Sequence, residues 1–183
     1  MRRALVPMLA VVAVAAFLAY GSLKRADSPA TVDASSTPDF APGIVDTVSD
    51  GDTIHVSDGR RVRFLQIDAP EVSQDECYAK DAAGALERLV PLSSTVSLQA
   101  DRALDKHDRF GRTLAYVFEG KTNLNLRLIE LGAAAPYFYR GDRGRYADEL
   151  MAAARRAKAE NRGLWGACPG TRLDPNRAVD TGP

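Results

Sequence analysis

The fold is decided by a stretch that reads Asp50-Gly51-Asp52-Thr53-Ile54-His55-Val56-Ser57-Asp58-Gly59-Arg60-Arg61-Val62-Arg63-Phe64-Leu65-Gln66-Ile67-Asp68-Ala69-Pro70-Glu71. Its two Asp-Gly pairs are hairpin turn signals, and the alternating residues between them are typical of short strands. A three-residue turn with a left-handed Gly59 pairs Ile54 with Val62 and keeps apolar side chains on one face, unlike a two-residue turn. We therefore predict a meander of strands over 43–49, 52–56 and 61–67.

The rest of the chain adds two strands and three helices. Apolar alternation predicts strands over 95–100 and 113–118, and helical spacing predicts helices over 78–90, 123–131 and 145–160. Five short strands with a helix between the third and the fourth fit an α+β fold with a mainly β core. We expect an OB-fold, a five-stranded Greek-key barrel with three helices, and another α+β roll of this size is the alternative.

The N-terminus has the pattern of an export segment. Two arginines precede an apolar run over 4–23, which suits either a cleaved signal peptide or a retained membrane anchor over 1–23. Residues 24–42 are polar and rich in Ser and Pro, which predicts a flexible linker. We expect the folded domain over 43–169 and a disordered tail over 170–183. The protein would then be secreted and extracellular, or anchored at the cell surface through residues 4–23, and would meet a membrane only in the second case.

The charge balance bears on nucleic-acid binding, and the cysteine content bears on disulfide formation. The chain has 24 Lys and Arg against 24 Asp and Glu. A non-specific nucleic-acid binder is usually basic, so a nucleic-acid function has to rest on local clusters. Two cysteines, Cys77 and Cys168, favour a disulfide in an exported chain, with two free thiols as the alternative.

Two aspartates of the meander are candidate metal ligands. Asp52 begins the second strand and Asp68 ends the third, so antiparallel pairing can bring the two carboxylates together. Like charges at close range call for a proton or a cation, and Ca²⁺ prefers carboxylate and carbonyl oxygens. The carbonyl of Ala69, restricted by the following Pro70, is a candidate third ligand. Ordinary turn chemistry is the alternative interpretation of these acids.

Other side chains could act on a phosphodiester. Arg63 and Arg112 could clamp a phosphate, because guanidinium groups form paired charge-assisted hydrogen bonds. Glu71 could serve as a general base towards water. Tyr137 and Tyr139 could stack on bases or sugars. Taken singly, each of these residues has an ordinary surface or packing interpretation.

The chain resembles the thermonuclease, or staphylococcal nuclease-like, family of secreted, calcium-dependent nucleases from about residue 43 to 165. The segments that carry the resemblance are Ser49-Asp50-Gly51-Asp52-Thr53, Arg63 with Ile67-Asp68-Ala69-Pro70-Glu71, Asp108-Arg109-Phe110-Gly111-Arg112 before Leu114-Ala115-Tyr116, Asn123 to Gly132, Tyr137-Phe138-Tyr139 and Gly163-Leu164-Trp165.

The resemblance implies specific roles. Asp52, Asp68 and the carbonyl of Ala69 would bind Ca²⁺, although many members have Thr in place of Ala69. Glu71 would activate the attacking water, and Arg63 and Arg112 would bind the phosphate. Tyr137 and Tyr139 would line the nucleotide pocket, and a Cys77–Cys168 bridge resembles a variant of exported members. The family hydrolyses DNA and RNA at the P–O5′ bond and leaves 3′-phosphate ends.

We therefore expect a monomeric Ca²⁺-dependent endonuclease. The rivals are a non-catalytic OB-fold module that binds nucleic acid and a surface module whose acids hold only structural calcium. The complete set of acids and arginines favours the enzyme, because a pure binder has no need of paired carboxylates. The loop after Glu71 is short and carries Cys77 where the family has a long basic segment, which bears on substrate preference.

Overall fold

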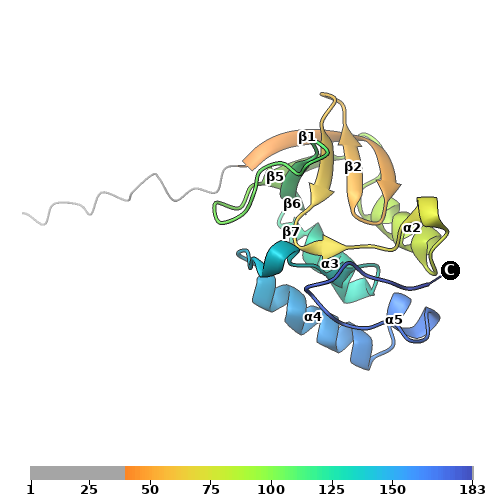
Figure 1. Ribbon diagram of the computed structural model, residues 1–183. Helices are drawn as coiled ribbons and strands as arrows, with labels where there is room; N and C mark the ends of the chain where they lie inside the picture. The colour runs from red at the N-terminus through yellow and green to blue at the C-terminus, as the bar shows by residue number, and fades with distance from the viewer. Residues whose placement is uncertain (1–39, 183) are drawn as a thin grey trace, which may run out of the picture. The chain divides into compact units, whose positions relative to one another are not determined.

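The computed structural model describes residues 40–182 (Figure 1). The expected export segment, and the linker up to residue 39, lie outside the described residues. Between residues 40 and 182, no helix combines the length and the apolar content needed to cross a membrane.

The meander forms with the expected register. Strand β1 (Phe40–Asp50) pairs with β2 (Thr53–Val56), which pairs with β3 (Arg61–Phe64). Ile54 lies opposite Val62, and Gly59 has a left-handed φ of 88°. Both features follow from the three-residue turn that keeps the apolar residues on one face. The first strand begins three residues before the expected boundary.

The third strand is shorter than expected. The sequence suggested one strand over 61–67, but β3 ends at Phe64 and a separate strand β4 (Ile67–Asp68) pairs with β8 (Ala135–Pro136). The break lies at Gln66, whose φ of 62° is left-handed and cannot continue a strand. Asp68 therefore stands on its own short strand beside the barrel.

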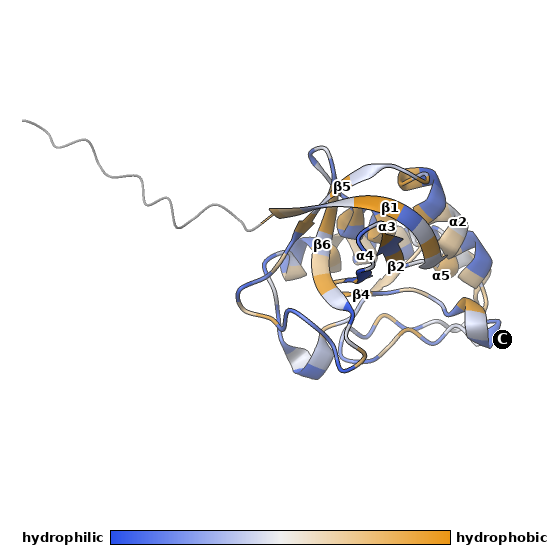
Figure 2. Ribbon diagram, turned by 90° about the horizontal axis from the view of Figure 1, so that it is seen from above, coloured by the Kyte–Doolittle hydropathy of each residue, from blue (hydrophilic) through white to orange (hydrophobic). Residues whose placement is uncertain are grey.

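A closed barrel of five strands confirms the predicted fold. β1 also pairs with β5 (Thr95–Gln99), β5 pairs with β6 (Thr113–Glu119), and β6 returns to β3 in a parallel pairing that closes the barrel. The short strand β7 (Thr122–Asn123) extends the sheet beyond β6. Apolar residues gather on the barrel strands and on the helices (Figure 2), and the core includes Ile54, Val62 and Phe64, which are at most 1% exposed. Burial of these side chains is the main favourable term in folding.

Within residues 40–182, three helices of more than two turns lie around the barrel. Helix α2 (Ala79–Leu89) packs on β1, and α3 (Leu124–Leu131) packs on α4 (Ala147–Ala159). Asn123 caps α3 by accepting from Leu126 N, and Gly132, with a φ of 69°, ends it in the left-handed conformation that glycine favours. The one-turn helix α5 (Leu164–Ala167) buries Trp165, which is 8% exposed.

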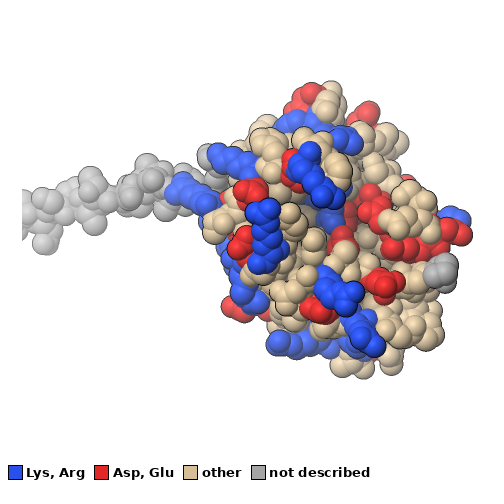
Figure 3. Space-filling view, in the orientation of Figure 1, with Lys and Arg blue, Asp and Glu red and all other residues tan. Residues whose placement is uncertain are grey.

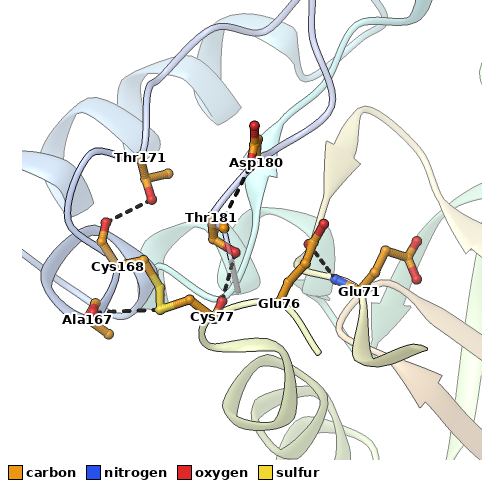
Figure 4. Close-up of a disulfide and its surroundings, with 9 residues drawn as sticks. Glu71, Glu76, Cys77, Ala167, Cys168, Thr171, Asp180 and Thr181 are labelled. Atoms are coloured by element: carbon orange, nitrogen blue, oxygen red, sulfur yellow. Dashed lines mark hydrogen bonds between the residues drawn. A yellow bond between two sulfur atoms is a disulfide. The ribbon is translucent and has the colours of Figure 1, made fainter. Parts of the chain in front are cut away.

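The C-terminal residues differ most from expectation. Cys77 and Cys168 form the expected disulfide, with Cα atoms 5.9 Å apart. We expected a disordered tail after it, but the structure places residues 170–182, the C-terminal strap, against the domain (Figures 1 and 4). The strap forms an isolated turn of its own, in which Arg177 N donates to Asp174 O, and several of its other backbone bonds reach distant residues such as Asp68, Cys77 and Phe138.

Candidate active site

Asp52 is a buried carboxylate at the start of β2. It is 3% exposed, and its N–H donates to Asp50 Oδ1 at 3.0 Å in the tight turn between β1 and β2. The turn needs Gly51, because a Cβ there would lie 2.7 Å from the Cβ of Ala69. Ala69 N donates to Asp52 Oδ2 at 2.7 Å. This bond connects the first hairpin to the segment that follows β4.

Arg63 lies between the two aspartates. Its Nη2 is 2.9 Å from Asp52 Oδ2 and 2.5 Å from Asp68 Oδ1, and its side chain is 10% exposed. Its Nη1 donates to the carbonyls of Phe64 at 3.0 Å and Ile67 at 2.8 Å. The guanidinium group thus holds the ends of β3 and β4 together and brings two carboxylates to one nitrogen.

The acids outnumber the one arginine between them. Burial raises the pKa of Asp52 well above its usual range; Arg63 opposes the rise, whereas Asp50 and Asp68 add to it. Burial also raises the pKa of Asp68 against the charge of Arg63. The same acids hold the pKa of Arg63 high despite its burial, so it stays protonated. The cluster therefore favours a further positive charge.

The donor set fits a hard divalent cation in its chemistry. Asp52 and Asp68 face a common point, and the main chain of Ala69 lies beside them. Carboxylate and carbonyl oxygens are the ligands that Ca²⁺ prefers. Residues 40–182 contain no group of three or more Asp, Glu, His or Cys side chains that could hold a metal. A cation here would thus bind to two carboxylates, with main-chain oxygen or water completing its shell, and would compete with Arg63 for them.

Glu71 lies just outside this buried pair. Its N–H donates to Glu76 Oε2 at 2.8 Å, and its carbonyl accepts from Gln74 N at 3.2 Å as the short helix η2 (Val72–Gln74) begins. Burial raises the pKa of the Glu71 carboxyl, and the charge of Asp50 adds to the rise. A carboxylate with a raised pKa at a cavity wall is suited to accept a proton from water.

Arg112 is held by an acid that the sequence interpretation gave no role of its own. Asp108 Oδ2 accepts from Arg112 Nε at 2.6 Å, and its Oδ1 accepts from the N–H groups of Phe110 and Arg112, both at 2.9 Å. Although burial opposes it, these bonds lower the pKa of Asp108 below its usual value. Asp108 therefore shapes the turn before β6 and fixes the direction of Arg112. The Asp-x-x-Gly-Arg spacing was the available signal.

Gln66 is a second residue that sequence reasoning missed. It is 7% exposed, its Nε2 donates to Asp142 O and its Oε1 accepts from Gly144 N, both at 2.7 Å. Its carbonyl also accepts from Tyr137 N at 3.0 Å. One residue thus binds both ends of the loop that carries the two tyrosines. A polar residue inside an apolar run was the signal for a buried amide.

These groups meet at a cavity of about 570 Å³. Its wall includes six of the candidate residues, Arg63, Asp68, Glu71, Arg112, Tyr137 and Tyr139. Asp52 and Ala69 do not reach the wall and lie buried behind it. The two tyrosine rings have centroids 6.5 Å apart, and Tyr139 is 54% exposed. Six of the candidate residues, from four parts of the chain, therefore meet at one cavity, whereas Asp52 and Ala69 do not line it.

Charge is unevenly distributed over this face. Lys and Arg gather over the left and centre of the view in Figure 3, and Asp and Glu gather to the right. Arg109, Arg112 and Arg140 line the cavity, and Phe110 lies beneath two of their guanidinium groups, at 4.7 Å for Arg109 and 5.5 Å for Arg112. A cleft with cations and exposed aromatic rings is suited to a polyanion that carries flat bases.

Comparison with known proteins identifies the family of the chain. Residues 61–167, more than half of the chain, match the family described as staphylococcal nuclease homologue. Thermonuclease of Staphylococcus hyicus is 34% identical over 125 residues, which cover 64% of this chain and 72% of that protein. An uncharacterized endonuclease of Escherichia coli is 35% identical over 128 residues, 67% of this chain and 76% of that protein.

The chain belongs to the staphylococcal nuclease homologue family.

Shared length differs among the relatives. Endonuclease YhcR of Bacillus subtilis (strain 168) is 31% identical over 138 residues, 67% of this chain, but the chain spans only 11% of that protein. The family match contains Arg63, Asp68, Glu71, Arg112 and both tyrosines. It begins after Asp52 and ends before the C-terminal strap, so the contacts in the structure connect these two parts to the matched residues.

Proposed function

We propose that the protein is a nuclease that hydrolyses phosphodiester bonds of DNA and RNA, depends on Ca²⁺ and leaves 3′-phosphate ends. One observation carries the proposal: a single cavity combines two arginines, a carboxylate of raised pKa, two tyrosines and Asp68, and Arg63 connects Asp68 to the buried Asp52. The endonuclease and thermonuclease names of the relatives support the reaction class. The calcium requirement and the 3′-phosphate products rest on the family resemblance.

Different residues bind different parts of the substrate around one phosphodiester. Arg112 and Arg63 bind the non-bridging oxygens and stabilise the charge that grows on them. Arg63 has to exchange a carboxylate partner for a phosphate oxygen, since both of its terminal nitrogens already contact protein oxygens. Tyr137 and Tyr139 hold the adjoining nucleotide.

The reaction transfers the phosphoryl group to water. Glu71 accepts a proton from the water that attacks phosphorus, the P–O5′ bond breaks, and the leaving oxygen takes up a proton. Asp52, Asp68 and the Ala69 carbonyl would hold Ca²⁺, which supplies Lewis-acid stabilisation of the phosphate when bound.

A direct test uses the full chain. Denatured DNA and RNA are incubated with Ca²⁺ or with chelator, beside Glu71→Gln and the control Glu87→Gln on an exposed position of α2. We expect Ca²⁺-dependent cleavage by the wild type and the control, 3′-phosphate ends, and a loss of about 10²-fold or more in Glu71→Gln. Intact nucleic acid with bound Ca²⁺ would indicate the calcium-stabilised module, and binding without cleavage would indicate the OB-fold binder.

Export is part of the proposal. A disulfide persists in oxidising compartments, which supports a secreted or surface-anchored protein. Fractionation of cells that express the full chain distinguishes the two forms: activity in the medium indicates cleavage within the leader, and activity sedimenting with membranes indicates an anchor. Activity confined to the cytoplasm contradicts export.

A further inference from the structure

The C-terminal strap is fixed to the domain at several points. Phe138 N donates to Pro175 O at 2.6 Å. At the far end, Thr181 Oγ1 donates to Cys77 O at 2.9 Å, and Cys77 N donates to Gly182 O at 2.7 Å. The strap thus leaves the disulfide at Cys168 and returns to the disulfide at Cys77 (Figure 4).

Between these attachments the strap reaches the active site. Val179 N donates to Asp68 Oδ2 at 2.8 Å, and Val179 itself is 9% exposed. The preceding residue, Ala178, lines the cavity together with Arg63 and Asp68. A segment that lies wholly beyond the family match therefore contributes to the wall of the site.

The two oxygens of Asp68 face different partners. Oδ1 contacts Arg63 Nη2, while Oδ2 accepts from Val179 N. Rotation of the carboxylate would break one bond or the other, so the pair of contacts fixes its plane. Outer hydrogen bonds of this kind orient ligating carboxylates and tune their affinity for a metal.

We propose that the strap is a structural part of the active site and that the main-chain N–H of Val179 is the group that positions Asp68. The strap does not touch the scissile phosphodiester; it acts through Asp68. The disulfide and the bonds at Cys77 hold the strap in register, so that the N–H arrives at Oδ2. The role of Asp68 as a cation ligand rests on the proposed function, whereas the positioning of its carboxylate does not.

The main test removes one N–H from the full chain. Val179→Pro lacks the donor. Arg172→Pro is the matched control, because Arg172 is exposed and its N–H donates to no group within residues 40–182.

We expect Val179→Pro to weaken Ca²⁺ binding about tenfold, as measured by calorimetry without nucleic acid. Its kcat falls at limiting Ca²⁺ and recovers at high Ca²⁺, with an unchanged KM for nucleic acid. Arg172→Pro behaves as the wild type, and Val179→Ala, which keeps the N–H, restores the affinity. Ca²⁺ affinity and kcat equal to wild type in a folded Val179→Pro would overturn the proposal.

A second measurement needs neither metal nor activity. Amide hydrogen exchange of Val179 is followed in the Ca²⁺-free wild type, in Asp68→Ala and in Glu71→Ala. We expect slow exchange in the wild type and in Glu71→Ala and fast exchange in Asp68→Ala, because only Asp68 accepts this N–H. An unprotected Val179 amide, or one indifferent to Asp68→Ala, rules the strap out of the site. If the wild type neither binds Ca²⁺ nor cleaves, the proposed function fails, and the exchange result still decides whether the strap positions Asp68.

Discussion

Arg63 and Arg112 differ in how the protein holds them, although both line the cavity. Arg63 is nearly buried and contacts two carboxylates and two carbonyls, whereas the Arg112 side chain is 23% exposed and forms an ion pair with Asp108. Removing one partner of a buried pair leaves an uncompensated charge, while a more exposed pair contributes little to stability. The two arginines can therefore take part in one reaction although they contribute very different amounts to the stability of the fold.

Alanine at each arginine should separate these contributions. We expect Arg63→Ala to lower the free energy of unfolding by about 3–5 kcal/mol at pH 7, because it leaves Asp52 buried without its partner. Arg112→Ala should lower it by about 1 kcal/mol or less. Both should reduce cleavage of denatured DNA by at least about 10²-fold. Urea unfolding and initial rates measure the two effects, and equal losses of stability would contradict this division.

Burial and, after it, the acids around Glu71 raise the pKa of this carboxyl and so set the pH dependence of the proposed reaction. Glu71 accepts a proton only when ionised, so activity falls as pH drops through its raised pKa. The charge of Asp50 contributes to that raised pKa and to the raised pKa of Asp52. Asp50→Asn keeps the Oδ1 that accepts from Asp52 N, so the turn is preserved.

We expect Asp50→Asn to shift the acid limb of the pH–kcat/KM profile to lower pH, since removal of a negative charge makes ionisation of both acids easier. The profile is recorded with denatured DNA at saturating Ca²⁺. Asp46→Asn, an exposed position on β1, is the control and should leave the limb in place. A shift to higher pH, or the same shift in the control, speaks against Glu71 as the base.

At the scale of elements, the tyrosine loop depends on the strand break at Gln66. Both ends of the amide of Gln66 bind main-chain groups of Asp142 and Gly144, and its carbonyl binds Tyr137 N. Between these points the loop includes the short helix η3 (Tyr139–Gly141) and the exposed ring of Tyr139. The position of the rings is thus fixed by a residue that lies between Arg63 and Asp68 in the sequence.

Gln66→Met should loosen this loop without touching the reacting groups. We expect KM for nucleic acid to rise about five- to tenfold with kcat changed less than about twofold, and stability to fall by about 1–3 kcal/mol from the unpaired loop groups. The control is Gln99→Met, which removes the buried Oε1 that accepts a hydrogen bond from Tyr146 Oη and should cost stability but leave KM unchanged. A similar rise of KM in both variants would contradict a specific role of Gln66 in the loop, because the rise would then follow from a general loss of stability.

Local pattern predicted the elements well because each depends on neighbours in sequence. The Ile54–Val62 register follows from one turn and one alternation, and the α3 boundaries follow from a capping Asn123 and a terminal Gly132. The two misses depend on distant partners. Gln66 bonds to a loop 76 to 78 residues away, and Val179 bonds to Asp68 across 111 residues. No periodicity in either segment records such a partner.

The candidate site was predictable to a similar degree. Short segments with fixed spacing supplied Asp52, Arg63, Asp68 and Glu71, because the β2–β3 hairpin and the short strand β4 that follows it bring them together. That Arg63 lies directly between the two aspartates was not expected, since strand pairing fixes where chains run and not how a long side chain turns. The contribution of Ala178 to the cavity wall was not expected either, because strand pairing does not place the C-terminal strap.

At the scale of the whole molecule, the attraction of nucleic acid has to come from local clusters of positive charge. The formal net charge is zero, so no overall attraction draws nucleic acid to the protein. Cations nevertheless line the cavity, where Arg109, Arg112 and Arg140 share the wall with acids such as Asp105 and Asp142. Binding by this cluster releases counterions from phosphates, which makes affinity depend on salt in proportion to the contacts formed.

The salt dependence of the affinity for nucleic acid should therefore report how many arginines contact phosphate. For a single-stranded substrate each neutralised phosphate contributes a slope of about −0.7 in a plot of log affinity against log salt, so three contacts predict a slope of about −2. We expect Arg109→Gln and Arg140→Gln each to reduce the slope by about 0.7, whereas Arg127→Gln, exposed on α3 and paired with Glu130, leaves it unchanged. The measurement is KM for single-stranded DNA at fixed Ca²⁺ between about 50 and 200 mM NaCl, a range over which such contacts are sensitive. If all three variants keep the wild-type slope, the arginines of the cavity do not contact phosphate and the substrate follows another path across the protein. If Arg127→Gln alone changes it, that path runs over α3.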